Sequence, residues 1–162
     1  MPGDAPRIMR IPMAAFRLIR EAARHILRRP VVGIAAAART ADGRWLLIRR
    51  GDTGDWALPG GTLEWGETLR EGIVREILEE AGAGVESLGD LSGVYSRPDR
   101  DVRFHAVTIV VRARISEPTQ PPINSLEIRD VRLFSDDALP DAIGMGMADM
   151  IRDARGTGAH WE

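Results

Sequence analysis

The stretch GTLEWGETLREGIVREILEEAGA, residues 61–83, decides how this chain folds. Thr68 and Glu71 match the T-x-x-E capping box, so a helix is predicted to begin at Leu69. Gly82 suits the left-handed conformation that commonly ends a helix. The apolar side chains recur at helical spacing, and the expected buried side of the helix consists of Leu69, Ile73, Val74, Ile77 and Ala81.

The same helix carries three closely spaced carboxylates, those of Glu76, Glu79 and Glu80. Glu76 shares a face with both of the others, and like charges at these spacings destabilise a helix by roughly 0.2–0.5 kcal/mol per pair. A bound cation removes that repulsion, and carboxylates without Cys or His partners suit hard ions such as Mg²⁺, Mn²⁺ or Ca²⁺. A solvated acidic face is the alternative interpretation.

The residues upstream of the helix favour the metal-binding interpretation. From Gly61 the sequence fits G-x5-E-x7-R-E-U-x-E-E-x-G-U, in which U is an aliphatic residue. The fixed positions are matched by Gly61, Glu67, Arg75, Glu76, Glu79, Glu80 and Gly82, and the first U by Ile77. On this pattern the chain resembles the Nudix hydrolase family over roughly residues 31–153. Ala83 departs from the pattern because the last U is usually larger, which bears on local packing rather than on chemistry.

The resemblance implies a hydrolase that cleaves a nucleoside diphosphate linked to another moiety, with Mg²⁺ as its cofactor and Mn²⁺ as a second option. It also implies the metal ligands, which are the main-chain carbonyl of Gly61 and the carboxylates of Glu76, Glu79 and Glu80. Arg75 and Glu67 are implied to orient the catalytic carboxylates, and this requires the loop after Gly61 to fold back over the helix. The alternative for this pair is a surface ion pair that contributes about 0–1 kcal/mol.

The general base has several candidates. Glu79 lies within the motif, whereas family members often add a carboxylate from a later loop. Here LEIRDVRLF resembles the stretch that carries it, so Glu127 is the first choice and Asp130 the second. Asp99 and Asp101 are further options. The alternative for Glu127 is a solvated residue at the entry to a strand.

The loop SRPDRDVR, residues 96–103, gives the main indication of the substrate. Pro98 stands fifteen residues after Ala83, a spacing similar to that of ADP-ribose pyrophosphatases within the family. Arg side chains suit phosphate and ribose oxygens because they bind in bidentate fashion. The alternative is a plain turn, with Pro and Asp where turns prefer them.

Aromatic residues near the motif are candidates for stacking on a base. Trp56 and Trp65 flank the glycine-rich loop and are preferred, whereas Trp45 lies in a predicted strand and is expected in the core. Tyr95 and Phe104 are further options. The complete set of candidate substrate-binding residues is Arg49, Trp56, Arg97, Pro98, Arg100 and Arg103.

Length and composition indicate an ordinary globular domain. The chain has 162 residues, 44% of them hydrophobic and 28% charged, and it has no Cys, which excludes disulfides and thiolate–zinc sites. The apolar run 31–38 is too short to span a bilayer, and three Arg residues between positions 17 and 24 interrupt any secretory signal. We therefore expect a cytoplasmic protein without a membrane partner.

The N-terminal region differs in charge from the rest. Residues 1–30 hold seven Arg against two acids, a net charge of +5, and the remainder holds 15 Arg against 22 acids, a net charge of −7. Residues 1–12 are expected to form a loose arm and residues 13–29 an amphipathic helix, with an apolar side formed by Phe16, Ile19, Ala23, Ile26 and Leu27. Its basic side is interpreted as solvated. A dimer contact comes second, and nucleic-acid or membrane binding is least favoured.

The remaining elements alternate loosely between strands and helices. Strands are predicted at 31–38, 45–50, 88–95, 104–115 and 128–134, with an Asp-Gly hairpin turn at 40–43 and a final helix at 141–155. The segment ALPGGTLEWGE has too many Gly and Pro for a regular element, and residues 156–162 are expected to be a mobile tail. Residues 31–155 thus form one predicted Nudix domain. Its expected fold is α/β (α+β), an α/β/α sandwich with a central mixed sheet and an extra N-terminal helix.

The predicted function is Mg²⁺-dependent cleavage of ADP-ribose or a nucleotide sugar, with a small-molecule nucleotide as the partner. A MutT-type (d)NTP pyrophosphohydrolase is the alternative. A catalytically silent nucleotide-sensing module is a third interpretation, and the intact set Arg75, Glu76, Glu79 and Glu80 argues against it. A homodimer is left open, because family members are often dimers.

Overall fold

The computed structural model describes Arg17, Arg20, Glu21 and residues 29–162. The predicted arm over residues 1–12 lies outside the described residues, as does the predicted helix over 13–29 apart from Arg17, Arg20, Glu21 and Arg29. Of these four, Arg17, Arg20 and Glu21 are helical. In the described part, neither helix has the length and apolarity needed to cross a lipid bilayer.

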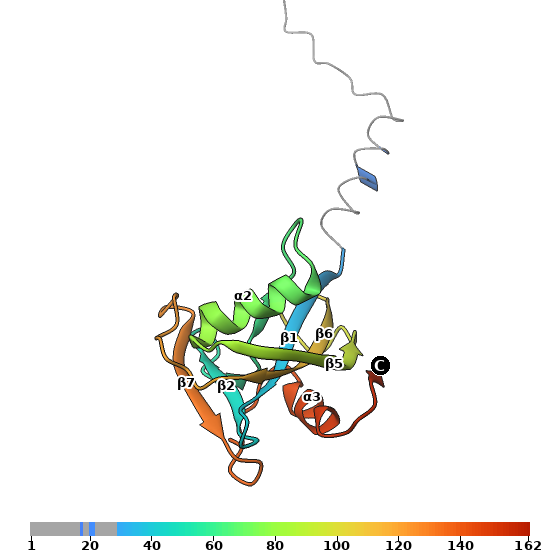
Figure 1. Cartoon of the computed structure of the whole chain (residues 1–162). Helices are drawn as coiled ribbons and strands as arrows, with labels where there is room; N and C mark the ends of the chain where they lie inside the picture. The colour runs from blue at the N-terminus through green and yellow to red at the C-terminus, as the bar shows by residue number, and fades with distance from the viewer. Residues whose placement is uncertain (1–16, 18–19, 22–28) are drawn as a thin grey trace, which may run out of the picture.

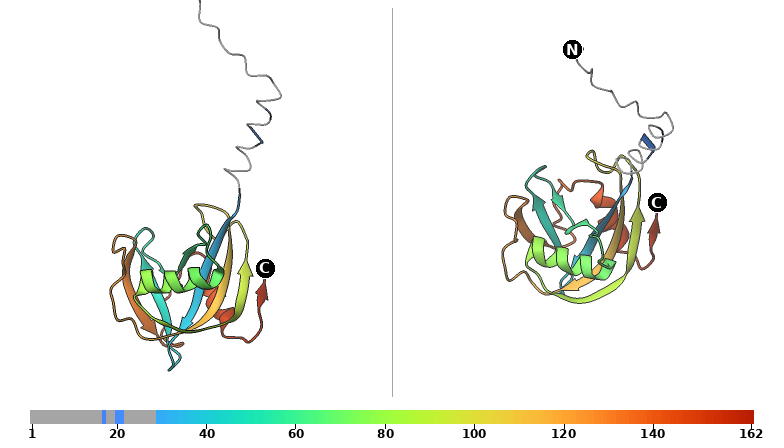
Figure 2. Two further views of the ribbon diagram at one scale, coloured as in Figure 1. Left: turned by 45° about the horizontal axis from the view of Figure 1, so that its top comes forward. Right: turned by 90° about the horizontal axis from the view of Figure 1, so that it is seen from above.

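Within residues 29–162, eight strands form one mixed sheet, and two helices pack on it (Figure 1). The elements are β1 (Val31–Arg39), β2 (Trp45–Arg50), β3 (Trp56–Ala57), β4 (Gly60–Thr62), α2 (Leu69–Ala81), β5 (Val85–Tyr95), β6 (Ala106–Ile115), β7 (Ile128–Phe134), α3 (Met147–Ala154) and β8 (His160–Trp161). The strand order is β3-β2-β1-β6-β5-β8, with β4 added to β1 and β7 added to β2. α2 lies on one side of the sheet and α3 on the other (Figures 1 and 2), which confirms the predicted α/β/α sandwich.

β1 is the central strand. It runs parallel to β6 along its whole length and antiparallel to β2 at one end and β4 at the other. Residues 34–38 are all buried, as expected for a strand covered on both faces. Ile73 and Ile77 of α2 are fully buried, and so is Trp45 at the start of β2, as predicted.

Two predictions about the motif region were wrong. The segment ALPGGTLEWGE contains the last residue of β3 and the whole of β4, because β3 pairs with β2 and β4 pairs with Gly33–Ala35 of β1. On α2, Val74 is 41% exposed, whereas the carboxylates of Glu76 and Glu80 are on the buried side. The apolar pattern predicted a buried side that includes Val74, whereas the buried side observed for α2 includes Glu76 and Glu80.

The predicted final helix is shorter than expected. α3 begins at Met147 rather than at 141, because Met145 and Gly146 both have positive φ, at 55° and 63°. The preceding segment pairs with β3 instead, since Trp56 N–H donates to the Ala142 carbonyl and Gly144 N–H donates to the Trp56 carbonyl, both at 2.9 Å. Pairing with a strand therefore replaces the first turns of the predicted helix.

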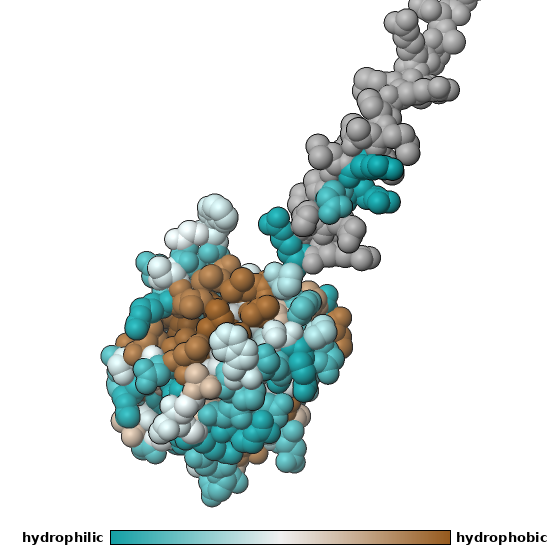
Figure 3. Space-filling model, turned by 90° about the vertical axis from the view of Figure 1, so that its right-hand side faces the viewer, coloured by the Kyte–Doolittle hydropathy of each residue, from teal (hydrophilic) through white to brown (hydrophobic). Residues whose placement is uncertain are grey.

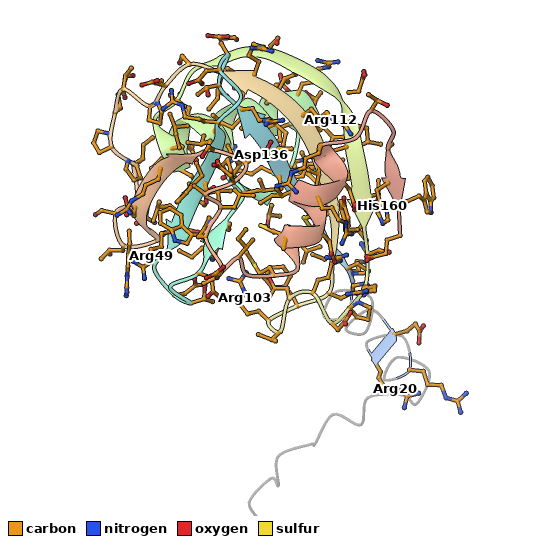
Figure 4. All side chains as sticks on the ribbon, turned by 90° about the horizontal axis from the view of Figure 1, so that it is seen from below. Arg20, Arg49, Arg103, Arg112, Asp136 and His160 are labelled. Carbon is orange, nitrogen blue, oxygen red and sulfur yellow. The ribbon has the colours of Figure 1, made fainter. Side chains whose placement is uncertain are left out.

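The predicted mobile tail is ordered. β8 runs parallel to β5, and the Arg112 guanidinium donates to the carbonyls of Gly156 and Gly158, both at 2.8 Å (Figure 4). The Glu162 carboxylate accepts from the backbone N–H groups of Ser96 and Arg97 at 2.7 and 2.8 Å, and Arg100 Nη2 donates to it at 2.5 Å. The tail therefore holds the 96–103 loop in place.

Removing the Glu162 charge should destabilise the fold. Arg100 is mostly buried, and its hydrogen bonds hold the pKa of Glu162 at about 2. Losing charged hydrogen bonds of this kind costs about 1.5–3 kcal/mol, so Glu162→Gln should lower the Tm by roughly 4–10 °C. Differential scanning calorimetry at pH 7 measures this, with Glu117→Gln as a control, because Glu117 pairs with Arg44 at an exposed position. Equal Tm values for the two variants would contradict the assignment.

Candidate active site

Both ends of α2 are fixed, and this sets where its carboxylates point. At the start, Glu71 N–H donates to the Thr68 hydroxyl at 3.3 Å and Thr68 N–H donates to the Glu71 carboxylate at 2.8 Å, which confirms the capping box. At the end, Gly82 is left-handed with φ 60°, as predicted, and its N–H donates to the Leu78 carbonyl at 2.9 Å. Fixed ends leave little freedom in the helical register between them.

The glycine-rich strand β4 lies directly against the acidic side of α2. Gly60 N–H donates to Glu80 Oε2 at 2.7 Å. A Cβ added at Gly61 would overlap the Glu76 carboxylate, so only glycine lets the backbone approach this side chain so closely. The structure therefore places Gly61, Glu76 and Glu80 together, as the sequence predicted for a shared metal site.

Arg75 ties the loop to the helix. Its guanidinium donates to both Glu67 carboxylate oxygens, at 2.8 and 3.1 Å, and to Glu76 Oε1 at 2.8 Å. It also reaches the Thr62 carbonyl at 3.3 Å and Glu79 Oε2 at 3.5 Å. The hydrogen bonds between Arg75 and Glu67 lower the pKa of Glu67 and raise the pKa of Arg75. The loop therefore folds back over the helix, as the predicted roles of these residues require.

Burial and mutual repulsion raise the pKa of two motif carboxylates. Burial is the main cause of the raised pKa of Glu80, about 8, and the nearby charges of Glu76 and Glu127 add to it against the Gly60 hydrogen bond. Burial also raises the pKa of Glu76, although Arg75 acts in the opposite direction. The cluster thus holds more carboxylates than its one arginine neutralises, which favours a cation.

Glu127 joins this cluster from the loop between β6 and β7. Ile123 N–H donates to the Glu79 carbonyl at 2.8 Å, which holds the loop against α2. Gly51 N–H donates to the Glu127 carbonyl at 2.6 Å, and the Asn124 side-chain amide donates to the Glu127 carboxylate at 3.2 Å. These bonds direct Glu127 toward the same cavity as the motif carboxylates.

The cavity has a volume of about 480 Å³. Glycines, acidic residues and one arginine of the motif region line it together with Glu127, namely Gly60, Gly61, Arg75, Glu76, Glu79 and Glu80. Further cations and apolar groups also line it, namely Arg50, Arg100, Arg103, Phe104, Ile123, Met145, Met147 and Met150. A volume of this size suits a small molecule.

The other base candidates differ in position. Asp101 lines the cavity, but Arg103 donates to it at 2.6 Å and lowers its pKa. Asp130 pairs with Arg132 at 2.7 Å and Asp99 pairs with Arg97 at 3.3 Å, and neither lines the cavity. Glu79 and Glu127 are therefore the carboxylates best placed to accept a proton.

Four candidate substrate residues do not line the cavity. Trp56 is buried with its ring edge-on to Phe134 at 4.9 Å, so it packs the core. Arg49 lies at the periphery (Figure 4), where it donates to the Gly54 carbonyl at 3.0 Å. Arg97 and Pro98 are exposed, and the Arg97 backbone N–H donates to Glu162 of the C-terminal tail. The predicted substrate contact of these four residues therefore lies outside this cavity.

Arg100 and Arg103 both line the cavity but differ in availability. The guanidinium nitrogens of Arg100 donate to Glu162 and to the Gly146 carbonyl, so it positions the loop instead of contacting substrate. Arg103 pairs with Asp101 and Asp52 at the rim and is 39% exposed. It therefore remains a candidate for phosphate contact.

Sequence reasoning missed two parts of the site. Arg50, not Arg49, faces the cavity, because β2 shifts its register on β7 between these two residues. Met147 and Met150 are buried and also line the cavity. The bulge between Arg49 and Arg50 has no signal in the sequence.

Comparison with known proteins agrees with this geometry. Residues 27–154 match the family model of the NUDIX domain. The chain belongs to the Nudix hydrolase family.

Relatives of this Nudix chain carry several functional names. It is 44% identical over 85 residues to a MutT-like protein of Streptomyces ambofaciens, covering 52% of each chain. It is 50% identical over 72 residues to an ADP-ribose pyrophosphatase of Methanocaldococcus jannaschii, covering 43% of this chain and 42% of that one. The matches thus span about half the length of these curated relatives. A MutT NUDIX hydrolase crystal structure from Burkholderia pseudomallei aligns with TM-score 0.68 and 30% identity, over 78% of this chain and 98% of that one.

The donors of this Nudix site suit a hard divalent cation, and Nudix hydrolases generally use divalent metals. Within residues 29–162 no three acidic or histidine side chains are already close enough to form a complete ligand set. Arg75 Nη1 donates to Glu76 Oε1 at 2.8 Å, and Glu80 Oε2 accepts from the Gly60 N–H, so both carboxylates already have partners. These side chains would therefore have to rotate to hold a cation.

The raised pKa of Glu80 predicts that ionisation of this buried carboxyl destabilises the fold as pH rises, and that a bound metal ion offsets the loss. The folded chain binds this proton more tightly than the unfolded chain, so the free energy of unfolding falls as pH rises from about 4.5 to about 8. In EDTA, the Tm of Glu80→Gln minus the Tm of wild type should increase by at least about 5 °C between pH 5 and pH 8.5. Differential scanning fluorimetry measures this, and Mg²⁺ at pH 8.5 should stabilise wild type more than the variant.

The matched control is Glu86→Gln, an exposed carboxylate on β5. It should follow wild type at every pH. A relative Tm of Glu80→Gln that stays constant with pH would show that Glu80 ionises normally.

Proposed function

We propose that this chain hydrolyses the diphosphate bond of a nucleoside diphosphate linked to another moiety, with ADP-ribose or a nucleotide sugar preferred and Mg²⁺ as cofactor. The observation that carries the proposal is one cavity lined both by the motif carboxylates and by arginines. Such a cavity suits a ligand that brings both a diphosphate and its counter-cation. The named ADP-ribose pyrophosphatase among the relatives supports the choice of substrate class.

Gly61, Glu76, Glu80 and Glu79 would hold the cation. When bound, a divalent cation offsets the negative charge of the diphosphate and promotes ionisation of water. Mn²⁺ satisfies the same oxygen donors.

The side chains then divide the remaining work. Arg75 donates to Glu76 and is itself held by Glu67, so Arg75 stays in place while the Glu76 carboxylate turns toward a ligand. Arg50 and Arg103, which line the same cavity, would bind phosphate oxygens. Phe104 and the three methionines give an apolar surface for a base or sugar.

In the chemical step, water attacks one phosphorus as its proton passes to a carboxylate. A new P–O bond forms, the bridging P–O bond breaks, and the second phosphate leaves with the bridging oxygen. ADP-ribose would give AMP and a sugar phosphate. We assign the base to Glu127, with Glu79 as the alternative, because both line the cavity.

A MutT-type (d)NTP pyrophosphohydrolase is the second candidate function, supported by the MutT-like relative. It would release a monophosphate and pyrophosphate from the same site. A silent sensing module is less supported, because the acidic set is intact and Arg75 pairs with Glu67 and Glu76.

A substrate panel tests the proposal. The protein is incubated with Mg²⁺ and ADP-ribose, NADH, nucleotide sugars, diadenosine polyphosphates or (oxidised) dNTPs, and products are identified by ion-pair chromatography. We expect the highest kcat/KM for ADP-ribose or a nucleotide sugar, and little activity in EDTA. Highest kcat/KM on a dNTP would select the MutT alternative, and hydrolysis of none of them would reject the enzymatic assignment.

Glu80→Gln tests the proposed metal-binding residues. It should reduce kcat by at least about 10²-fold with an unchanged circular dichroism spectrum, since the uncharged amide keeps the shape but binds the cation poorly. Full turnover by this variant would remove Glu80 from the site.

Two further variants, Glu127→Gln and Glu79→Gln, separate the base candidates. A general base contributes typically 10²–10⁴-fold, so Glu127→Gln should lower kcat by that factor with a small change in KM and should remove the acidic limb of the pH–rate profile. Glu79→Gln should keep that limb. The reverse result would move the base to Glu79, and Glu86→Gln serves as the control that follows wild type.

A further inference from the structure

An uncovered apolar face lies on the α2 side of β1, β6 and β5. We define the apolar face by Val32 on β1, Val107, Ile109 and Val111 on β6, Leu91 and Val94 on β5, and Val74 and Leu78 on α2. Strand pairing sets Val32 beside Val107, Ile109 beside Val94, and Val111 beside Leu91, so these side chains share one side of the sheet. Val32, Val74, Leu78 and Leu91 are 40–47% exposed.

Figure 3 shows apolar residues gathered in one continuous area on this side of the molecule, next to the point where the chain enters β1. Monomeric soluble proteins rarely expose contiguous apolar patches larger than a few hundred Å² without a partner. The area therefore calls for an occupant.

The apolar face is distinct from the active site. Side chains alternate along a strand, and on β6 it is Ala106 and Thr108 that line the cavity. Val107, Ile109 and Val111 point to the other side. On α2, Val74 and Leu78 stand one turn apart on the side away from Glu79.

The N-terminal segment of the same chain has a matching pattern. Its apolar residues Phe16, Ile19, Ala23, Ile26 and Leu27 recur at helical spacing. The described residues of this segment, Arg17, Arg20 and Glu21, are helical and exposed. Docking would cover the apolar side of the segment and leave its charged side in solvent.

The connection is short. β1 begins at Val31, directly after Arg29 and Pro30, and Val32 belongs to the apolar face. A helix over residues 13–28 is about 24 Å long, and the β6 part of the face spans about 13 Å, so two to three turns suffice to cover it. A tether of so few residues gives an effective concentration on the order of millimolar, which favours the same chain over a second copy.

Charge also favours this occupant. Residues 1–30 carry +5 and the remainder carries −7. Leu91 has the exposed carboxylate of Asp90 as its neighbour on β5, and Glu86 is exposed on the same strand. Arginines along the edges of a docked helix would lie near these acids.

We propose that residues 13–28 dock on the apolar face of their own chain as an amphipathic helix. The helix completes the fold on the side of the sheet that α2 leaves open. This assignment rests on packing and charge, and it does not depend on the substrate of the enzyme.

The absence of Cys makes the test specific. Arg20→Cys places one thiol on the charged side of the segment for a nitroxide spin label, and the ¹⁵N-labelled full-length protein is examined by NMR. We expect paramagnetic broadening of amide signals from residues 91–94 and 107–111, at least twofold in peak height, and none for β7. No broadening beyond that caused by free nitroxide would overturn the proposal.

A mixed sample separates the same chain from a second copy. Spin-labelled ¹⁴N chains are combined with unlabelled ¹⁵N chains, and the same signals are measured. Absence of broadening in this sample supports docking within one chain, whereas broadening here would overturn it in favour of an exchanged or dimeric arrangement.

A variant pair checks that the apolar side makes the contact. Ile19→Asp with Ile26→Asp should abolish the broadening and increase binding of the dye ANS several-fold, because the face becomes uncovered. The matched control, Arg24→Ser, should keep the broadening. Retention of the effect in the double Asp variant would overturn the proposed contact.

Discussion

The structure depends on Arg75, which connects three segments that would otherwise separate. Its guanidinium holds Glu67 from the loop, Glu76 from its own helix, and the carbonyl of Thr62 from β4. Planar, bidentate pairing of this kind is specific to Arg, and a Lys at the same position would lack the rigid fork that makes it. With the loop held down, the Gly60 N–H reaches Glu80 and Gly61 lies against Glu76.

This arrangement keeps carboxylates close together despite their charge. One arginine offsets part of the repulsion, and burial raises the pKa of Glu76 and Glu80 further. Groups held in unfavourable arrangements are common at functional sites, because ligand binding can restore the stability that they cost. A bound cation would relieve the repulsion that this geometry creates, which is why we propose a cation-binding role for the Nudix motif.

The sequence predicted the parts of the fold that rest on local pattern. The capping box, the Gly82 cap, the hairpin and the strands β1, β2 and β7 were found within a residue or two, because each is set by neighbours in the chain. What it could not give depends on distant contacts. The ordered tail needs Arg112 and Arg100, the delayed start of α3 needs pairing with β3, and the choice of Arg50 over Arg49 needs a bulge against β7. The candidate site divides in the same way, with the motif placed correctly and the substrate residues placed in part.

The central claim is that the carboxylates of α2 and the carbonyl of Gly61 together bind a divalent cation. An anomalous difference map from crystals grown with Mn²⁺, collected at the manganese edge, tests it most directly. The account predicts a peak between Gly61 and the carboxylates of Glu76 and Glu80, with Arg75 still paired to Glu67. Mn²⁺ bound only elsewhere, or no bound Mn²⁺ at millimolar concentration, would contradict it.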